Sequence, residues 1–379
     1  MRARAALLKQ SGLSLPYAQS KPLHIETITL APPGPDEVLV RIAAAGLCHS
    51  DLSVINGDRP RPTPLALGHE ASGIVVECGS HVHDLQRGDH VVMSFVPTCG
   101  HCAMCIDGRA ALCEPGNAAN AQGRLLSGAS RITCDDGVVN HHCGVCAFSE
   151  YSVISRRSIV KIPQDIPLTH AALFGCAVMT GVGAVMNTCD VRAGQSVAII
   201  GLGGVGLSGI LGALACGASK VIAVDLDDRK LAFASSLGAT HVFNAQDPDC
   251  AAQIRDLTGG GVDAAIELAG SVKAFENAFA MTRRGGISAT GGLPHPDARV
   301  TLPAVMMVAE ERQVRGSYMG SCVPSRDIPH YMDLYRSGRL PVQKLMSSTG
   351  PLDTINEHFD LLHKGDVVRH VIDLSLIHI

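Results

Sequence analysis

Four cysteines in one short segment have the spacing of metal ligands. They follow the pattern C-x2-C-x2-C-x7-C and are Cys99, Cys102, Cys105 and Cys113. Four thiolates this close together can enclose a zinc ion tetrahedrally and leave it no open position, as in a structural zinc site. An iron–sulfur cluster also takes four thiolates, and zinc ribbons that bind nucleic acid use similar spacing. The acidic balance of the chain, with a net charge of -4, argues against the ribbon.

A second set of candidate ligands is dispersed along the first half of the chain. Cys48 begins the tetrad CHSD, His69 lies in GHE, and Cys176 lies in FGCAVMTG. Two thiolates and one imidazole leave zinc an open position, which a catalytic site requires. We expect Asp51 to orient the imidazole of His69 through its other ring nitrogen, and Glu70 lies next to that histidine. Since an isolated cysteine is usually a core residue, this interpretation depends on a nicotinamide site elsewhere in the chain.

A glycine loop directly follows the apolar run SVAII. Gly201, Gly203 and Gly206 form the pattern G-x-G-x-x-G. The first glycine allows a tight turn, the second lets a pyrophosphate approach the backbone, and the third lets helix and strand pack closely. The next apolar run, KVIAVD, ends in Asp225, whose carboxylate can bind both hydroxyls of an adenosine ribose and repel a 2′-phosphate. The pattern therefore predicts a dinucleotide site that prefers NAD to NADP.

Two kinds of segment must position these residues. In residues 38–96, short apolar runs alternate with turn signals, which predicts a β-rich domain. Residues 168–187 have a helical pattern, and from Ser196 the rhythm changes to alternating strands and helices. The expected strands of that part are SVAIIG, KVIAVD, HVFN, VDAAIELAG and GGISATGG. This alternation predicts an α/β, doubly wound parallel sheet inserted between two pieces of another domain.

Composition agrees with two globular domains and limits the partners. The 379 residues are 46% apolar but only 3% aromatic, so aliphatic side chains must form the core. The net charge gives no reason to expect nucleic acid or a membrane as partner. Residues 193–219 carry no charge and could span a bilayer by length, but their glycines favour the buried nucleotide-binding unit. Because no export signal precedes the 14 cysteines, we expect a reducing, cytoplasmic location.

The set and order of these motifs resemble the zinc-containing, medium-chain alcohol dehydrogenase family. GHEASGIVVECG is similar to the zinc signature of that family. The CHSD tetrad, the four-cysteine lobe, GCAVMTGVGAVMNT, GLGGVGLS and VVRHVIDL follow the family's order over essentially the whole chain. The resemblance implies a GroES-like catalytic domain in residues 1–178 and 320–379, a Rossmann NAD-binding domain in residues 179–319, and an active site in the cleft.

The resemblance also implies roles for single residues. Cys48, His69 and Cys176 are the implied ligands of a catalytic zinc, and the four lobe cysteines are those of a structural zinc, which gives two zinc ions per chain. The implied catalytic residues are His49, Ser50, which takes the alcohol proton, Asp51 and Glu70. The implied cofactor-binding residues are His49, Thr180, Gly201, Gly203, Gly204, Val205, Gly206, Asp225, Lys230, Leu268 and Arg369. The implied residues of the substrate pocket are Phe95, His142, Cys143, Leu293 and Tyr318.

The chain departs from better-known members of that family at several positions. Ser53 stands where several relatives have a relay histidine, so the proton from Ser50 must leave by water or another group. His142 and Cys143 replace larger apolar residues, which leaves the substrate undefined. Asn117 lies near the place where glutathione-dependent formaldehyde dehydrogenases carry an arginine for the carboxylate of their substrate.

We therefore expect a zinc-dependent, NAD-linked alcohol dehydrogenase that moves a hydride between a primary alcohol, aromatic or allylic, and its aldehyde. The alternatives are an S-(hydroxymethyl)glutathione dehydrogenase and a catalytically inactive NAD-binding protein on the same fold. The expected partners are the small-molecule alcohol and aldehyde and further copies of the chain. The long stretch 113–148 resembles that of dimeric relatives, so a homodimer is expected, with a homotetramer as the alternative.

Overall fold

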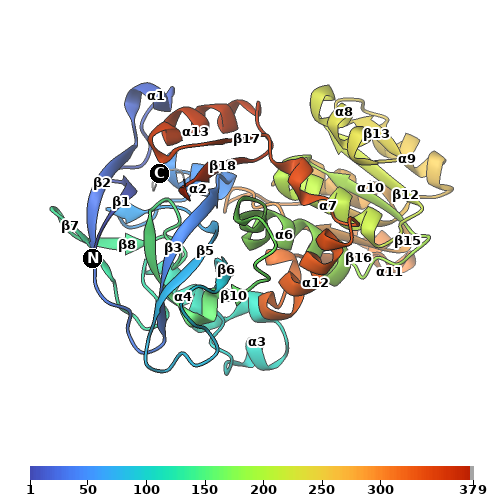
Figure 1. Cartoon of the computed structure of the whole chain (residues 1–379). Helices are drawn as coiled ribbons and strands as arrows, with labels where there is room; N and C mark the ends of the chain where they lie inside the picture. Colours follow the sequence, from blue (N-terminus) through green and yellow to red (C-terminus); the bar gives the residue numbers. More distant parts are fainter. Residues whose placement is uncertain (376–379) are drawn as a thin grey trace. The chain divides into compact units, whose positions relative to one another are not determined.

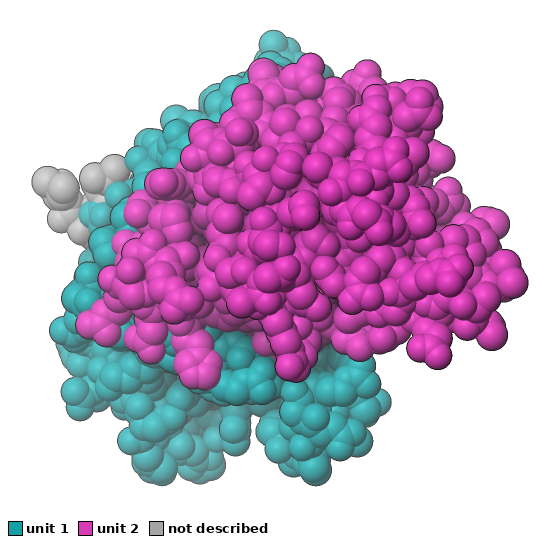
Figure 2. Space-filling view, turned by 90° about the vertical axis from the view of Figure 1, so that its right-hand side faces the viewer, with its two compact units in different colours: residues 1–176, 323–329, 346–379 teal, residues 177–322, 330–345 magenta. Residues whose placement is uncertain are grey.

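The computed structural model describes residues 1–375 (Figure 1). The chain forms two compact units, which Figure 2 shows in teal and magenta. Unit 1 consists of Met1–Cys176, Val323–Pro329 and Met346–Ile379, and unit 2 of Ala177–Cys322 and His330–Leu345. The expected division after residue 178 differs by two residues from the first of these boundaries.

Residues 330–345 depart from the expected domain organisation, since they group with unit 2 instead of the first domain. Tyr331 lies 3.3 Å from the side-chain amide of Asn187, and Arg339 donates a hydrogen bond to the backbone of Ala215. Leu340 and Val342 are fully buried. These contacts with two helical segments of unit 2 explain why residues 330–345 belong to that unit. The sequence after residue 320 has no pattern from which the contacts could be predicted.

Unit 1 contains a small closed barrel with the strand order β1-β2-β7-β8-β4. Its strands are β1 (Arg2–Leu8), β2 (Leu23–Leu30), β4 (Leu65–Ala66), β7 (Ile132–Cys134) and β8 (Gly137–His141). A seven-stranded sheet has the order β10-β6-β5-β3-β18-β17, with β9 paired to β3. Its strands are β3 (Glu37–Gly46), β5 (Glu70–Cys78), β6 (His90–Met93), β9 (Tyr151–Ser155), β10 (Ile159–Lys161), β17 (Ser348–Gly350) and β18 (His370–Asp373).

Short helices connect and cover the strands of unit 1. The α-helices are α1 (Tyr17–Ser20), α2 (His49–Ile55), α3 (Ala103–Ile106), α4 (Glu114–Ala121), α5 (Leu168–Ala171) and α13 (Ile355–Lys364). The 3-10 helices are η1 (Ala110–Leu112), η2 (Arg156–Ser158), η3 (Ala172–Gly175) and η7 (Leu352–Thr354). Helix α12 (Pro324–Arg336) belongs to unit 1 in its first half and to unit 2 in its second half.

Unit 2 is built on a six-stranded parallel sheet with the order β13-β12-β11-β14-β15-β16. Its strands are β11 (Ser196–Ile200), β12 (Lys220–Asp225), β13 (His241–Asn244), β14 (Val262–Glu267), β15 (Thr282–Thr290) and β16 (Gln313–Gly316). The chain order reverses between β11 and β14, and in such sheets ligands bind beside the carboxyl ends of the strands at this point. The five strands expected from the sequence are present, and the edge strand β16 was not expected.

The helices of unit 2 precede the sheet, connect its strands or follow its last strand. They are α6 (Ala177–Gly183), α7 (Gly204–Ala215), α8 (Asp228–Leu237), α9 (Cys250–Thr258), α10 (Val272–Met281) and α11 (Ala304–Ala309), with the π-helix η4 (Ala184–Thr188) and the 3-10 helices η5 (Met319–Ser321) and η6 (Val342–Leu345). The uncharged residues 193–219 form β11, the glycine turn and α7. Within residues 1–375, no single helix is long and apolar enough to cross a membrane, and one pair that meets the criteria together, Leu168–Gly175 and Ala177–Thr188, is bent by 53°.

Candidate active site

Three candidate metal ligands of unit 1 come together. One ligand atom each of Cys48, His69 and Cys176 lies within 4.8 Å of the other two, and the two sulfur atoms are 4.0 Å apart. The sheet explains this grouping, because β3 pairs with β5 so that Gly46 lies opposite Glu70. Cys48 and His69 each lie just beyond these paired ends. All three side chains are buried, and two thiols with an imidazole suit zinc with one position left open.

Gly46 allows this close approach of the strands. A Cβ at this position would lie 2.3 Å from Oε1 of Glu70. Glu70 is fully buried, and its Oε2 lies 3.8 Å from Nη2 of Arg369. A side chain at position 46 would therefore displace the carboxylate that lies next to His69.

Asp51 holds the imidazole of His69 from helix α2. Its Oδ1 lies 3.0 Å from Nδ1 of His69 and 3.3 Å from the backbone nitrogen of Gly68, which donates to it. Nδ1 of His142 is 3.2 Å from the same oxygen, but the angle between the two groups is unfavourable for a hydrogen bond. Burial opposes the charged carboxylate, yet His69 and His142 together hold the pKa of Asp51 below its usual value. Nδ1 of His69 therefore faces Asp51, which leaves Nε2 for a metal.

The electrostatic surroundings of Cys48 favour a thiolate. The Cys176 thiol donates toward its sulfur and, with the Arg369 guanidinium nearby, lowers the pKa of Cys48 despite burial. Arg369 also donates to the backbone oxygen of Leu47 at 2.7 Å. Ser50 lies next to the cluster, with Oγ 3.8 Å from the Cys48 sulfur. The family resemblance implies that Arg369 binds the cofactor, and in the structure its side chain contacts Leu47 and Glu70 in unit 1.

The four lobe cysteines also gather into one group. Their sulfur atoms all lie within 4.8 Å of one another on the segment that forms α3, η1 and the start of α4. Backbone nitrogens donate to the sulfurs: Cys99 and Gly116 to Cys113 at 3.2 and 3.4 Å, and Cys102 to Cys99 at 3.3 Å. All 14 cysteines lie in the described part and none forms a disulfide. Four free thiols in this grouping fit a closed, tetrahedral zinc site.

The glycine loop in unit 2 has the shape that a dinucleotide needs. Gly201 has φ +90°, and a Cβ there would lie 2.7 Å from the backbone nitrogen of Ala269. A Cβ at Gly206 would lie 1.8 Å from the Gly201 oxygen, so the helix packs tightly on the turn. Nothing lies within 4 Å of a Cβ built at Gly203, and no side chain caps helix α7 there. The backbone nitrogens at the start of α7 are thus available for phosphate oxygens.

Asp225 ends β12 with its carboxylate already oriented. Oδ2 accepts the backbone N–H of Leu202 at 2.6 Å, and Oδ1 accepts those of Leu226 and Asp227 at 2.8 and 3.0 Å. A carboxylate offers about four acceptor positions. These bonds fix the group and leave an acceptor position on Oδ2 for a ribose hydroxyl.

The remaining predicted residues divide between the two units. His69 lies edge-on to Phe95 and to His142, with ring centroids 5.6 and 5.4 Å apart. Cys143 follows His142 with φ +53°, a strained value for a residue with a side chain. The residues that lie in unit 2 are Thr180, Gly204, Val205, Lys230, Leu268, Leu293 and Tyr318. Of these, Thr180 is buried in α6, and Leu293 is 55% exposed.

The positions that depart from the family have defined contacts. Ser53 donates from Oγ to the backbone oxygen of His49 at 2.8 Å, so its hydroxyl proton is used within α2. Asn117 donates its side-chain amide to the Cys113 oxygen at 2.8 Å. Two contacts were not expected from the sequence: the approach of His142 to Asp51, and the hydrogen bonds of Glu267 at the end of β14. The one signal in the sequence for the hydrogen bonds of Glu267 is the position of this acid at the end of the apolar run VDAAIE.

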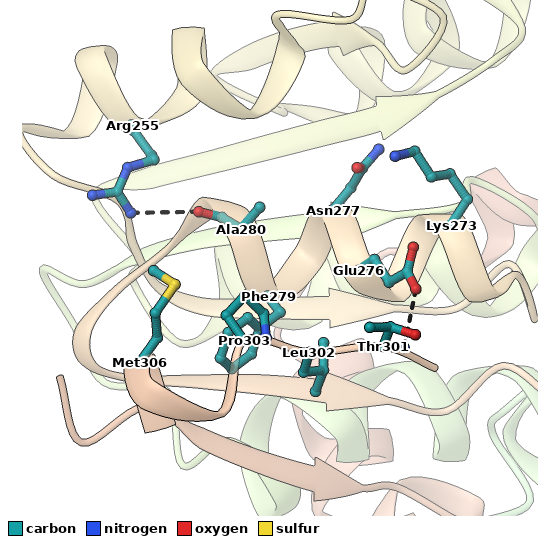
Figure 3. A pocket seen from close by; sticks show the side chains of 10 residues that line it. All are labelled: Arg255, Lys273, Glu276, Asn277, Phe279, Ala280, Thr301, Leu302, Pro303 and Met306. Carbon is teal, nitrogen blue, oxygen red and sulfur yellow. Dashed lines mark hydrogen bonds between the residues drawn. The ribbon is translucent and has the colours of Figure 1, made fainter. Parts of the chain in front are cut away.

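An open surface pocket of unit 2, of about 630 Å³, is not part of this site. Helices α9 and α10 and residues 301–306 line it (Figure 3), and none of the predicted site residues does. Two of its polar groups are engaged within the fold, since Arg255 donates to the Ala280 oxygen and Glu276 accepts from the Thr301 nitrogen. We assign it no role.

Comparison with known proteins identifies both parts of the chain. Residues 34–164 match the alcohol dehydrogenase GroES-like domain, and residues 204–337 match the zinc-binding dehydrogenase family. The "Putative alcohol dehydrogenase D" of Mycobacterium tuberculosis is 37% identical over 98% of this chain and 100% of its own length. An S-(hydroxymethyl)glutathione dehydrogenase of Synechocystis sp. is 36% identical over 98% of this chain and 100% of its own.

Solved structures agree with these relatives. Benzyl alcohol dehydrogenase from Acinetobacter calcoaceticus superposes with a TM-score of 0.92 at 32% identity, covering 98% of this chain and 99% of that one. An alcohol dehydrogenase zinc-binding domain protein from Burkholderia ambifaria gives a TM-score of 0.93 at 33% identity over the same shares. The architecture is thus a GroES-like domain with a Rossmann-type domain. The chain belongs to the zinc-containing, medium-chain alcohol dehydrogenase family, and it is an oxidoreductase by that membership.

Proposed function

We propose that this protein is an NAD-dependent alcohol dehydrogenase that interconverts a primary alcohol and its aldehyde. The observation that carries the proposal is the buried group of Cys48, His69 and Cys176 with Ser50 beside it. This donor set leaves one coordination position of a zinc ion open, whereas the four lobe cysteines would fill all four positions. The two sets support two zinc ions per chain, one catalytic and one structural.

The side chains of unit 1 have separate tasks in this proposal. Cys48, His69 and Cys176 would hold the zinc ion, which would act as a Lewis acid and lower the pKa of an alcohol hydroxyl. Ser50 accepts the alcohol proton at Oγ. Asp51 keeps the Nδ1 proton of His69 in place, which fixes the ring orientation. Phe95, edge-on to His69, excludes water from the reacting atoms.

The proton from Ser50 leaves by water or by another group in this proposal. Ser53 is a poor receiver, because its hydroxyl already donates to the His49 oxygen and its side chain carries no base. His49 itself follows Cys48 at the start of α2, where we propose that it also approaches the cofactor.

Asp225 supports NAD over NADP as the cofactor. A fixed carboxylate at this place can accept a ribose hydroxyl and repels a 2′-phosphate. Family membership alone does not decide the matter, since a zinc-binding dehydrogenase from Sinorhizobium meliloti, 25% identical with a TM-score of 0.80, is described as bound to NADP. Lys230, Leu268 and Thr180 are proposed to contact the same cofactor.

An aromatic or allylic alcohol is the proposed substrate class. The name of the benzyl alcohol dehydrogenase from Acinetobacter supports it. The S-(hydroxymethyl)glutathione dehydrogenase of Synechocystis supports a second candidate. Against that candidate, Asn117 is neutral and its amide is engaged with Cys113, so it offers no ion pair to a glutathione carboxylate.

A substrate and cofactor panel tests the proposal. Purified enzyme is assayed with benzyl alcohol, cinnamyl alcohol, 1-butanol and formaldehyde plus glutathione, each with NAD and with NADP. We expect kcat/KM to be highest for benzyl or cinnamyl alcohol and about 100-fold higher with NAD than with NADP, since like-charge repulsion costs several kcal/mol and each 1.4 kcal/mol is about tenfold. In Asp225→Gly the preference for NAD should fall below about tenfold.

Three results would contradict parts of this proposal. Turnover confined to the glutathione adduct selects the second candidate. Equal kcat/KM with NADP in the unmodified enzyme removes the role of Asp225. A chain that binds zinc and cofactor but oxidises no alcohol supports the inactive alternative. We further propose a cytoplasmic enzyme whose partners are the small-molecule alcohol and aldehyde and its own copies, as a homodimer or homotetramer, with no nucleic-acid or membrane partner.

A further inference from the structure

Glu267 ends strand β14 at the point where the strand order of unit 2 reverses. β14 pairs in parallel with β11, and Ile200 at the end of β11 lies opposite Glu267. The glycine loop that begins at Gly201 directly follows β11. The crevice beside the carboxyl ends of these two strands is where a dinucleotide binds in such sheets. Glu267 is therefore at the cofactor edge of the sheet, and none of the roles assigned above uses its carboxylate.

The carboxylate of Glu267 connects two loops. It is 1% exposed, and its Oε1 accepts the backbone N–H groups of Ala269, Gly270 and Ser271 at 2.7, 2.5 and 3.2 Å. Its Oε2 accepts the hydroxyl of Thr290, the last residue of β15, at 2.7 Å. One buried side chain thus closes the turn after β14 and ties it to the end of β15.

The two loops that Glu267 connects are also closely packed against each other. A Cβ at Gly292 would lie 2.1 Å from the nitrogen of Gly270, and one at Gly291 would lie 2.9 Å from Leu268 Cδ2. A Cβ at Gly201 would lie 2.7 Å from Ala269. Loop 268–271 thus lies between loop 291–293 and the glycine turn, and it packs closely against both.

The side of the sheet on which these loops lie indicates which half of the cofactor they meet. Asp225 is on β12, on one side of β11, and would take the adenosine ribose. β14 and β15 are on the other side of β11. A dinucleotide that crosses the glycine loop from β12 therefore extends its nicotinamide half toward the loops after β14 and β15.

We propose that Glu267 is a positioning residue for the nicotinamide half of the cofactor, which it serves by fixing loops 268–271 and 290–293. This inference rests on the proposed nicotinamide cofactor. It adds a residue outside the glycine motif to those that determine cofactor affinity. Its effect is on the shape of the binding edge, because the carboxylate is buried and already accepts four hydrogen bonds.

Two ligands separate positioning from simple loss of structure. NADH contains the nicotinamide half, and ADP-ribose lacks it but keeps the adenosine, pyrophosphate and second ribose. The dissociation constants of both are measured by calorimetry on zinc-loaded protein, together with the melting temperature and zinc content. In Glu267→Leu we expect NADH to bind at least about tenfold more weakly and ADP-ribose to change less than about threefold, because several positioning hydrogen bonds are lost only around the nicotinamide.

Glu267→Gln is the conservative variant. Its amide oxygen still accepts the three backbone N–H groups, and its NH2 group can donate to Thr290. NADH affinity should recover to within about threefold of the unmodified protein.

Asp263→Leu is the matched control, since Asp263 lies on the same strand at its opposite end. Its carboxylate accepts the backbone nitrogen and hydroxyl of Ser196 at 2.8 and 2.7 Å and Arg283 Nε at 2.7 Å. We expect a lower melting temperature and an unchanged ratio of NADH to ADP-ribose affinity. If this control changes the ratio as much as Glu267→Leu does, the proposal is overturned.

Equal weakening of NADH and ADP-ribose in Glu267→Leu would also overturn it. If that variant does not fold, Thr290→Val serves instead, because it removes only the donor to Oε2 and leaves the three N–H bonds intact. It should weaken NADH about threefold and leave ADP-ribose unchanged, and an unchanged NADH affinity contradicts the proposal. Unmodified protein that binds neither ligand contradicts the proposed function instead, so the two failures are distinguishable.

Discussion

Cys48 and Cys102 show how the surroundings of a thiol separate two metal-binding tasks. Cys48 is buried at the end of a strand and belongs to the set with an open position, and Cys102 belongs to the closed set of four. A structural zinc contributes folding free energy, whereas a catalytic zinc chiefly serves turnover. The same substitution at the two positions should therefore have different consequences.

We predict about two zinc ions per chain in the unmodified protein and about one in each variant. Cys48→Ala should lose turnover and keep its melting temperature within a few degrees. Cys102→Ala should lower the melting temperature by roughly 5–10 °C, since a few kcal/mol shift a domain of this size by that amount. Elemental analysis and thermal unfolding measure both effects, and Cys216→Ala, a thiol of neither set, is the control. Iron in place of zinc, or two zinc ions retained in both variants, would refute the assignment.

Motifs made the ligand residues predictable, and tertiary contacts made others unpredictable. Cys48, His69 and Cys176 belong to recognisable patterns, so their proximity could be inferred without a structure. Glu267 belongs to no pattern, because three of its partners are backbone N–H groups, which every residue type except proline offers. His142 could be placed in a pocket by resemblance, but its approach to Asp51 depends on the fold bringing the residue after β8 to the start of α2.

At the scale of elements, strands with an apolar sequence could be predicted, whereas a strand with a polar sequence could not. The expected strands KVIAVD and HVFN are β12 and β13 residue for residue, and the expected strand SVAIIG is β11 without its final glycine. The edge strand β16, QVRG, is mostly exposed and has no apolar pattern to detect. Residues 168–187, predicted as helical, are divided into α5, η3, α6 and η4, with the candidate ligand Cys176 at a break with φ -142°. Helical periodicity does not reveal such a break, which here lies at a residue proposed to bind zinc.

Two stacked histidines on α13 and β18 should make unit 1 sensitive to acid. The rings of His358 and His370 lie 3.4 Å apart with an angle of 20°, and His370 Nδ1 is 2.8 Å from the hydroxyl of Ser348. Burial, followed by the nearby His358, lowers the pKa of His370 to about 3. The unfolded chain therefore binds a proton near pH 6.5 that the folded chain does not. This contribution to stability is complete above pH 6.5 and is lost as the pH falls below that value.

His370→Asn tests this element, because its Oδ1 can replace Nδ1 as acceptor and cannot titrate. From pH 7 to pH 5 the unmodified protein should lose up to about 2 kcal/mol through this residue, and the variant should lose correspondingly less. Urea unfolding followed by circular dichroism at several pH values gives the slope. His295→Asn is the control, since His295 is largely exposed and its Nδ1 lies 3.7 Å from the carboxylate of Asp297. Parallel slopes for the unmodified protein and His370→Asn would contradict the prediction, because they would show that His370 binds protons equally in the folded and the unfolded chain.

At the scale of the whole molecule, the sequence predicted two domains and their order but not the return of residues 330–345 to unit 2. The parallel sheet could be predicted because its strands are buried and apolar. The return segment attaches through a few contacts, such as that of Arg339 with the Ala215 oxygen at 3.1 Å. Every residue type has a backbone carbonyl, so the identity of the accepting residue does not indicate such a hydrogen bond. The assignment of residues 330–345 to unit 2 therefore requires the structure.

The edge of unit 2 supports the proposed self-association. Strand β16 pairs with β15 on one side, and within residues 1–375 no strand pairs with its other side. Nearby in the chain, helix α11 exposes Val305 and Val308 by 70% and 82%. An open edge strand can pair with another chain, exposed apolar side chains favour such a contact, and a twofold axis lets two identical edges pair with each other. A second copy of the chain is therefore the partner that we propose for this edge.

Val308→Lys should weaken that contact, because it places two like charges near the twofold axis. We predict that the molar mass from size-exclusion chromatography with light scattering falls from a dimer toward a monomer, or from a tetramer toward a dimer, at micromolar concentration. The control is Val138→Lys, an exposed valine (53%) on the barrel strand β8 of unit 1, which should leave the mass unchanged. A monomeric unmodified protein would end the proposal of self-association. An oligomer that Val308→Lys leaves intact would place its interface on another surface, while a loss of mass without loss of the melting transition would assign the interface to this edge.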